Sequence, residues 1–90
     1  MAVTHSIVSI GTTATTISSA VSDRDGHSVL IQNPSASTTV YIGGTGVTTS
    51  SYGVALAGGG DISIDLLQGE IVYGVVASST QNVNVLRAGN

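Results

Sequence analysis

The segment Asp61-Ile62-Ser63-Ile64-Asp65-Leu66 decides the fold class, because its side chains alternate strictly between polar and apolar. Successive side chains of a β-strand point to opposite faces of the sheet, so Ile62, Ile64 and Leu66 would share one face. The polar residues between them would then face away from the core. This period of two predicts a half-buried β-strand.

The same alternation recurs in two other places. Residues 82–85 read Asn-Val-Asn-Val, and residues 38–42 place Thr38, Val40 and Ile42 on one face. Both segments have the length of a short strand and the β-branched content that packs well on a pleated surface. We therefore predict strands at both positions, each with one face toward the core.

Four further segments are interpreted as strands on weaker patterns. Residues 27–32 and 70–77 are nearly continuous apolar runs, for which we expect both faces of the strand to be covered. Residues 6–10 and 14–21 alternate less clearly, because serine and threonine blur the pattern. No segment carries the apolar stripe and caps of a helix. Turn signals separate the strands at short intervals: Gly11, Asp25-Gly26, Asn33-Pro34, Gly43-Gly44, Gly58-Gly59-Gly60, Gln68-Gly69 and Ser78-Ser79.

This spacing predicts an all-β fold, a small antiparallel β-sandwich or barrel (jelly-roll or Ig-like) of about 7–8 short strands. The 90 residues are long enough for one small domain and show no linker or fixed-period repeat, so residues 1–90 are expected to form a single β domain. Residues 1–10 are interpreted either as an N-terminal arm that adds a strand to a partner's sheet or as an edge strand. In the arm interpretation both of its faces would be covered.

The composition excludes several functional classes. Serine, threonine and glycine account for 36 of the 90 residues, charged residues for 8%, and the formal net charge is −3 with no lysine. Two cations cannot neutralise a phosphate backbone, so we expect no nucleic-acid partner. No apolar run reaches the roughly 18–20 residues of a membrane-spanning helix. The absence of cysteine removes disulfides and thiolate chemistry. So little surface charge favours a protein that works within an assembly.

Two groups of acidic residues are candidate metal-binding or catalytic sites. The segment Asp23-Arg24-Asp25-Gly26-His27 resembles the start of a calcium loop, but the later ligands of such a loop are missing, and a hairpin turn explains it better. Asp61 and Asp65 would share one strand face with their Cα atoms about 13 Å apart. That separation is too large for a pair of catalytic carboxylates, so we expect them to solvate an outer face or protect a sheet edge.

The remaining polar motifs also favour structural roles. A hydrolytic triad would need His5 or His27 beside a serine and a carboxylate, and no nucleophile-elbow pattern surrounds any serine. The glycine stretches 43–46 and 58–60 precede neither a lysine nor a helix, so they are interpreted as turns rather than phosphate cradles. Tyr41, Tyr52 and Tyr73 are the only aromatic residues and are expected to fill the core or contact a partner. We predict no enzyme activity and no catalytic, cofactor-binding or metal-binding residue.

Three stretches carry a resemblance to a known family. They read VLIQNPS at residues 29–35, TTVYIGG at residues 38–44 and EIVYGVVAS at residues 70–78. The first two resemble a hairpin, and the third a late central strand, of the capsid decoration (cement) proteins of tailed bacteriophages. The resemblance spans about two-thirds of the chain, from Val29 to Arg87, and its motifs carry no chemistry, so it implies no site residue.

The resemblance implies a structural virion protein that binds the outer surface of a phage capsid and bridges major capsid protein subunits. It also implies a homotrimer or other homo-oligomer on the capsid lattice, made in the host bacterial cytoplasm and located on the capsid exterior. Two alternatives stay open: a minor tail, baseplate or head–tail joining protein, and a receptor-binding module. A receptor-binding module would need an exposed aromatic or charged patch.

Overall fold

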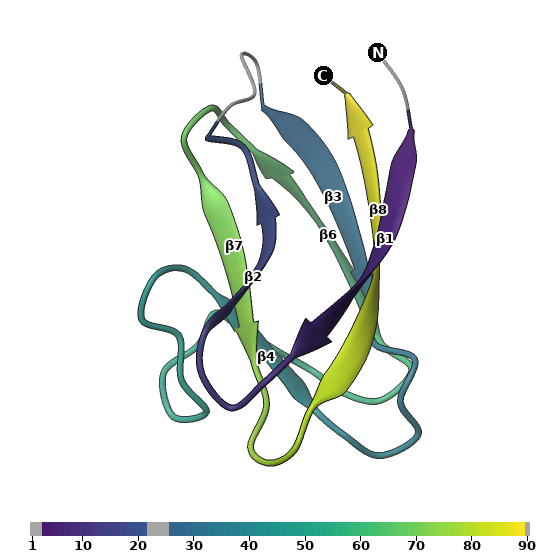
Figure 1. The fold of residues 1–90 in the computed structure, drawn as a ribbon, viewed down its shortest axis with the longest axis vertical. Coiled ribbons are helices and arrows are strands. Elements are labelled where there is room, and N and C mark those ends of the chain that lie inside the picture. The colour runs from purple at the N-terminus through teal and green to yellow at the C-terminus, as the bar shows by residue number, and fades with distance from the viewer. Residues whose placement is uncertain (1–2, 22–25, 90) are drawn as a thin grey trace.

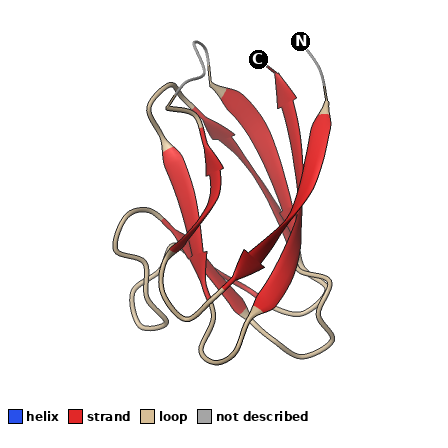
Figure 2. Ribbon diagram, viewed as in Figure 1, coloured by secondary structure: helices blue, strands red, loops and turns tan. Residues whose placement is uncertain are grey.

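The computed structural model describes residues 3–21 and 26–89 of the chain, which form β-strands, turns and loops (Figures 1 and 2). The first strand begins and the last strand ends at the same end of the molecule (Figure 1). The strands in chain order are β1 (Thr4–Ile10), β2 (Thr15–Ser19), β3 (His27–Gln32), β4 (Val40–Gly43), β5 (Val54–Leu56), β6 (Asp61–Leu66), β7 (Ile71–Val75) and β8 (Gln81–Gly89).

These strands form two antiparallel four-stranded sheets that pack face to face as a sandwich, not a closed barrel. Sheet A has the strand order β1-β8-β3-β6, and sheet B has the order β2-β7-β4-β5. Each sheet therefore has one central pair of strands and two edges. The predicted all-β class and the sandwich alternative are confirmed, and every segment interpreted as a strand contains one.

The core lies between the sheets and consists mainly of β-branched side chains. Alternation turns Val29 and Ile31 of β3 and Val83 and Val85 of β8 toward sheet B, where all four are buried. On β6 the alternation predicted for Ile62 and its neighbours is also present. Burial of each such side chain contributes roughly 1.5–3 kcal/mol, which is the main favourable term in a domain of this size.

The apolar run in β3 does not have two covered faces, so that expectation is wrong. Val29 and Ile31 face the core, whereas Ser28, Leu30 and Gln32 are exposed. The run appeared continuous because an apolar residue, Leu30, occupies an outward position. In β7 the expectation that both faces are covered holds for Val75, which is buried although its side chain points away from the core.

The segments 29–35 and 38–44 do not form a hairpin. Strand β3 pairs with β6 and β8, while β4 pairs with β5 and β7, so the chain crosses from sheet A to sheet B between them. The side chain of Asn33 holds this corner: its Nδ2 donates to the carbonyl oxygens of Thr38 at 2.7 Å and Leu56 at 2.9 Å. Its Oδ1 accepts from the backbone N–H of Ser35 at 3.2 Å. The buried amide thus satisfies backbone groups that strand pairing leaves free.

The glycine stretch 58–60 forms a corner, as predicted. The backbone N–H of Gly60 donates to the carbonyl of Ala57 at 2.9 Å, and Gly59 has a positive φ of 80°. Gly26 also has a positive φ, 76°, and a Cβ atom placed there would collide with the carbonyl oxygen of Leu66. Of the predicted turn at residues 23–27, positions 23–25 lie outside the described residues. Gly26 itself has the backbone conformation that such a turn requires.

Candidate interaction surface

The two aspartates of β6 lie where the sequence places them, on the outward face of an edge strand of sheet A. Asp65 accepts a hydrogen bond of 2.6 Å from the hydroxyl of Ser28 on the neighbouring strand. Asp61 lies opposite Gln32 at the other end of the same strand pair. Both positions fit the expected roles of solvating the outer face and placing charge at a sheet edge.

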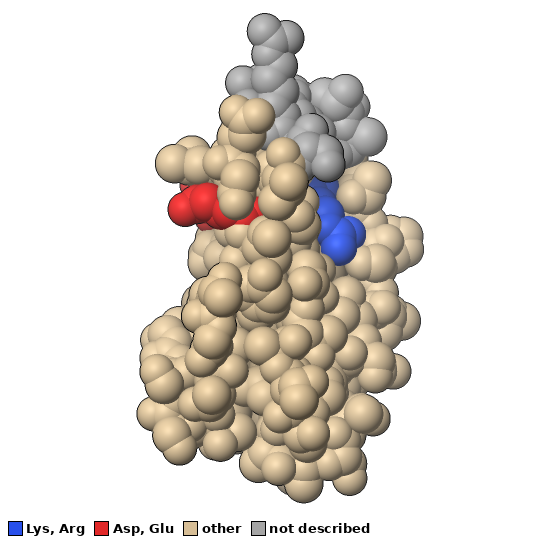
Figure 3. Space-filling model, turned by 60° about the vertical axis from the view of Figure 1, so that its left-hand side comes forward, with Lys and Arg blue, Asp and Glu red and all other residues tan. Residues whose placement is uncertain are grey.

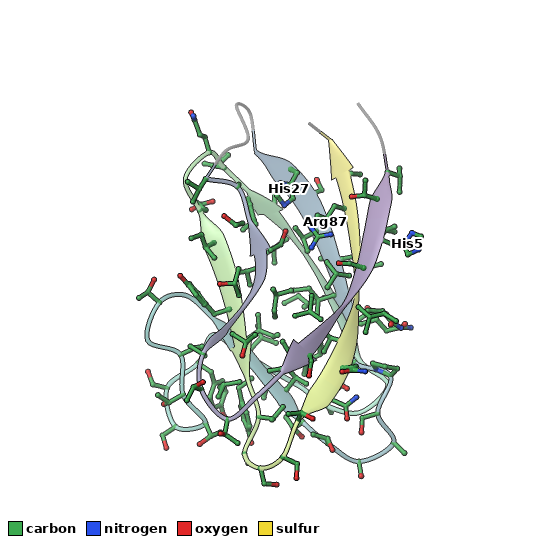
Figure 4. The ribbon with its side chains drawn as sticks, in the orientation of Figure 1. His5, His27 and Arg87 are labelled. Carbon is green, nitrogen blue, oxygen red and sulfur yellow. The ribbon has the colours of Figure 1, made fainter. Side chains whose placement is uncertain are left out.

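The two histidines lie in different environments. His5 is exposed on the outward face of β1, whereas His27 is buried between the sheets near Arg87 (Figure 4). His27 Nε2 lies 2.8 Å from the hydroxyl of Ser18, and Arg87 Nε donates to the same hydroxyl at 2.9 Å. The fold thus brings together three polar residues that are far apart in the sequence and that no local pattern connects.

The Ser18–His27 pair has the spacing of a nucleophile and its base but not the accessibility that catalysis needs. Ser18 is 3% exposed. Its oxygen accepts from a guanidinium, which withdraws electron density from the hydroxyl. Arg87 also donates to Ser6 at 3.1 Å and to the Ile17 carbonyl at 3.3 Å, so one side chain links β8 with β1 and β2. We assign this cluster to closing one end of the sandwich.

The structure offers no metal site among the residues it describes. Within 3–21 and 26–89, no three His, Asp or Glu side chains gather closely enough to share an ion. The candidate calcium ligands Asp23 and Asp25 lie outside those ranges. In the glycine stretch 43–46, Gly43 ends β4 and residues 44–46 belong to the connection between β4 and β5, where the Val47 N–H donates to the Gly44 carbonyl at 3.1 Å in a turn.

The outward face of sheet A carries an exposed apolar band formed by Ile7, Leu30 and Leu86. Strand register places Leu86 of β8 directly beside Leu30 of β3, and Ile7 of β1 lies one row further along. Their side chains are 67%, 36% and 42% exposed, respectively. A shallow groove of about 350 Å³ runs along the band. Such a cluster on three adjacent strands is larger than the scattered single apolar residues of an ordinary surface.

Polar side chains border the apolar band. Asn84 of β8 donates through Nδ2 to Oε1 of Gln32 at 3.0 Å, and Asp61 follows in the same row on β6. His5 lies beside Leu86 on the β1 side. The face is therefore apolar along a diagonal and rimmed by amides, one carboxylate and one imidazole. This is the arrangement of a protein–protein contact, with an apolar centre and a polar rim.

The outward face of sheet B differs, because residues 44–53 fold over it. Val47 in this loop is buried, and a Cβ atom placed on Gly43 would lie 2.9 Å from its Cγ2, so Val47 packs directly on the backbone of β4. The Gly53 N–H donates to the Ile42 carbonyl at 2.8 Å and fastens the end of the loop to the same strand. Val75 of the neighbouring β7 is only 2% exposed.

The tyrosines belong to this covered side of the molecule. Tyr41 and Tyr73 are half-buried on the outward face of sheet B, and Tyr52 in the loop packs against Tyr41 with ring centroids 4.8 Å apart. The prediction that the three rings fill the core is wrong, since valine and isoleucine occupy the space between the sheets. Their alternative role as partner contacts stays a prediction.

Charge is sparse and unevenly placed on the described surface. Figure 3 shows acidic side chains and a basic side chain near one end of the molecule, while the rest of the described surface in this view carries no charged side chain. A partner docking on the uncharged area would meet few ions that must lose their hydration.

No protein-family model matches the chain, and no curated protein matches it significantly. In the part of the chain that the structure describes, no helix is long and apolar enough to cross a membrane.

Proposed function

We propose that the chain is a structural virion protein that binds the outer surface of a phage capsid and bridges neighbouring major capsid protein subunits. The observation that carries this proposal is the exposed apolar band of Ile7, Leu30 and Leu86 on the outward face of sheet A, whose carboxylates lie on the edge strand β6. The resemblance of residues 29–87 to decoration proteins supplies the class of partner.

A rigid sheet is well suited to holding a shell together. The band lies on three hydrogen-bonded strands, so little backbone freedom is lost when it docks. The exposed serines on the same face, such as Ser63 beside Leu30, lose little side-chain entropy on burial. Each copy would bury a modest area, and repeated attachment across a lattice would make the combined contact strong, because every added contact acts at high effective concentration.

The charge balance fits the outside of the shell better than the inside. A lysine-free chain with a formal charge of −3 is repelled by packaged DNA, whereas the exterior imposes no such repulsion. The absence of cysteine suits assembly in the reducing cytoplasm of a bacterial host. We accordingly propose the capsid exterior as its location and a homotrimer or other homo-oligomer as its form on the lattice.

The copy number of the chain in purified particles tests this function. Quantitative mass spectrometry of gradient-purified phage whose genome encodes the sequence should find hundreds of copies, in simple ratio to the major capsid protein. A handful of copies per particle would instead indicate a tail, baseplate or head–tail joining role. Absence of the chain from the particles would overturn the virion proposal.

Binding of purified variants to particles stripped of the protein tests the docking face. The double variant Leu30→Asp with Leu86→Asp places two carboxylates in the band and should weaken capsid binding by at least about tenfold. Thr16→Asp is the matched control, because Thr16 is an exposed residue on the outward face of sheet B. Equal loss of binding for both variants, or unchanged binding of the double variant, would exclude this face.

A further inference from the structure

Strand β1 presents a free backbone edge in the described structure. It pairs with β8 through seven consecutive residue pairs, from Thr4 opposite Arg87 to Ile10 opposite Gln81, without a register shift. On its other side, no described strand follows in the sheet order. In an antiparallel pair, alternate residues turn their N–H and C=O groups away from the partner strand. Roughly 24 Å of β1 edge therefore offers hydrogen-bonding groups to another strand.

This edge lacks the features that normally prevent two sheets from joining. The strand reads Thr-His-Ser-Ile-Val-Ser-Ile, with no lysine, proline, aspartate or glutamate and no bulge in its pairing with β8. The opposite edge of the same sheet, β6, carries Asp61 and Asp65. Charged side chains on an edge strand are a common protection against unwanted pairing. Sheet A is thus protected at one edge and open at the other.

We propose that β1 pairs antiparallel with β1 of a second copy of this chain, so that two sheets A join into one eight-stranded sheet across a two-fold axis. A two-fold interface requires a surface that is complementary to itself. An uncharged strand meets this condition, because no like charges face each other. Two β6 strands could not pair in the same way without bringing together the carboxylates of both copies.

The position of Ile7 sets the register of the pair. Ile7 is the central residue of β1, and its outward side chain is the apolar residue nearest the free edge. Centring the two-fold axis there places Ile7 opposite the partner's Ile7 and His5 opposite the partner's Ser9. This register uses all seven residues of both strands. It also joins the two apolar bands into one continuous surface, since paired residues lie on the same face.

A second copy of the chain is favoured over an unrelated strand because it makes the two apolar bands continuous. Ile7 is exposed at the edge of its own band, and the symmetric pair covers it with an identical side chain while adding backbone hydrogen bonds. One strand pair is a smaller contact than the roughly 800 Å² per partner of a standard stable interface. We therefore expect a weak dimer in solution that has twice the docking face of one copy. The inference uses only β1 and does not depend on the capsid role.

Sedimentation of the purified chain across a wide concentration range tests the pairing. The chain should show a reversible monomer–dimer equilibrium. Ile7→Lys and Ile7→Glu should each weaken dimerisation by at least about tenfold, because like charges then face each other on the axis. An equimolar mixture of these two variants should form a heterodimer. Ser63→Lys, an exposed outward position on the opposite edge strand β6, is the control and should dimerise as the unaltered chain does.

A cross-linking experiment fixes the register, because the chain has no cysteine of its own. Side chains directly opposite each other have Cβ atoms about 4.5–5.5 Å apart, which lets a disulfide form with small adjustment. Ile7→Cys should give disulfide-linked dimers under mild oxidation much faster than Ser63→Cys. The proposal is overturned if the chain stays monomeric, if it forms trimers, or if both cysteine variants cross-link equally. A trimer would instead agree with the homotrimer proposed for the lattice, and none of these outcomes bears on capsid binding itself, which is measured on particles.

Discussion

Strands β7 and β8 both lie inside their sheets, yet their outward apolar residues have different surroundings. Val75 of β7 is 2% exposed although it lies on the outward face of sheet B, whereas Leu86 of β8 is 42% exposed on the outward face of sheet A. An outward apolar side chain stabilises the folded monomer only where other residues of the same chain bury it. The outward apolar residues of sheet A stabilise the monomer little, which agrees with the partner contact that we propose for them.

The largest difference between the two faces is expected when an outward apolar residue on each strand is replaced by aspartate. Val75→Asp buries an unpaired charge and should lower the free energy of unfolding by about 3 kcal/mol or more, enough to unfold much of a small domain. Leu86→Asp should change it by less than about 1 kcal/mol, because its side chain reaches water. Urea unfolding followed by circular dichroism measures both. Similar losses for the two variants would mean that the two faces are equally covered.

A milder change tests the loop over sheet B. Val47→Ala removes two methyl groups from the packing on Gly43 and should lower the free energy of unfolding by about 1–2.5 kcal/mol. Ser50→Ala, an exposed position in the same loop, is the control and should stay within about 0.5 kcal/mol of the unaltered chain. Equal urea midpoints for these two variants would contradict the packing of Val47 on the outward side of β4.

The tyrosine pair on the same side should have a smaller effect. Tyr52→Ala removes the ring contact with Tyr41 and should lower the free energy of unfolding by about 0.5–1.5 kcal/mol. Tyr52→Phe keeps the ring and should be nearly neutral. Thermal unfolding of both variants checks this, and a large loss with phenylalanine would point to the hydroxyl instead of the ring.

The smallest effect on stability is expected on the bare face of sheet A. Leu30→Thr and Leu86→Thr each introduce a β-branched side chain suited to a strand and should each change the free energy of unfolding by no more than about 0.5 kcal/mol. Surface hydrophobicity should fall clearly, measured as shorter retention on a hydrophobic-interaction column. A marked loss of stability would show that these leucines already have a partner within the chain.

Local pattern was enough to predict seven of the eight described strands and most turns, whereas the three-residue strand β5 was not predicted. The alternation in residues 61–66 and 82–85 arises from the two-residue period of the strand backbone, which does not depend on distant parts of the chain. The positive φ of Gly59 and Gly26 likewise reflects turn chemistry that neighbouring residues specify. For the same reason the interpretation of residues 6–10 as a strand needed no knowledge of its partner.

The candidate surface itself was not predictable. Leu30 and Val75 occur in similar apolar runs, and the sequence led us to expect both runs to be covered on two faces. Nothing in either run tells that the outward side chain of Val75 is buried while that of Leu30 is exposed. The cluster of Ser18, His27 and Arg87 was hidden for a related reason, since strands from both sheets had to meet before its hydrogen bonds existed.

The sequence by itself determined that this protein is a small all-β domain with a charge-poor, hydroxyl-rich surface, because composition and side-chain period are local properties of the chain. Only the tertiary structure decided which strands are neighbours, that residues 29–35 and 38–44 belong to different sheets, and which apolar face stays bare. Those choices depend on contacts between residues far apart in sequence, and their free energies appear only when the two sheets pack together.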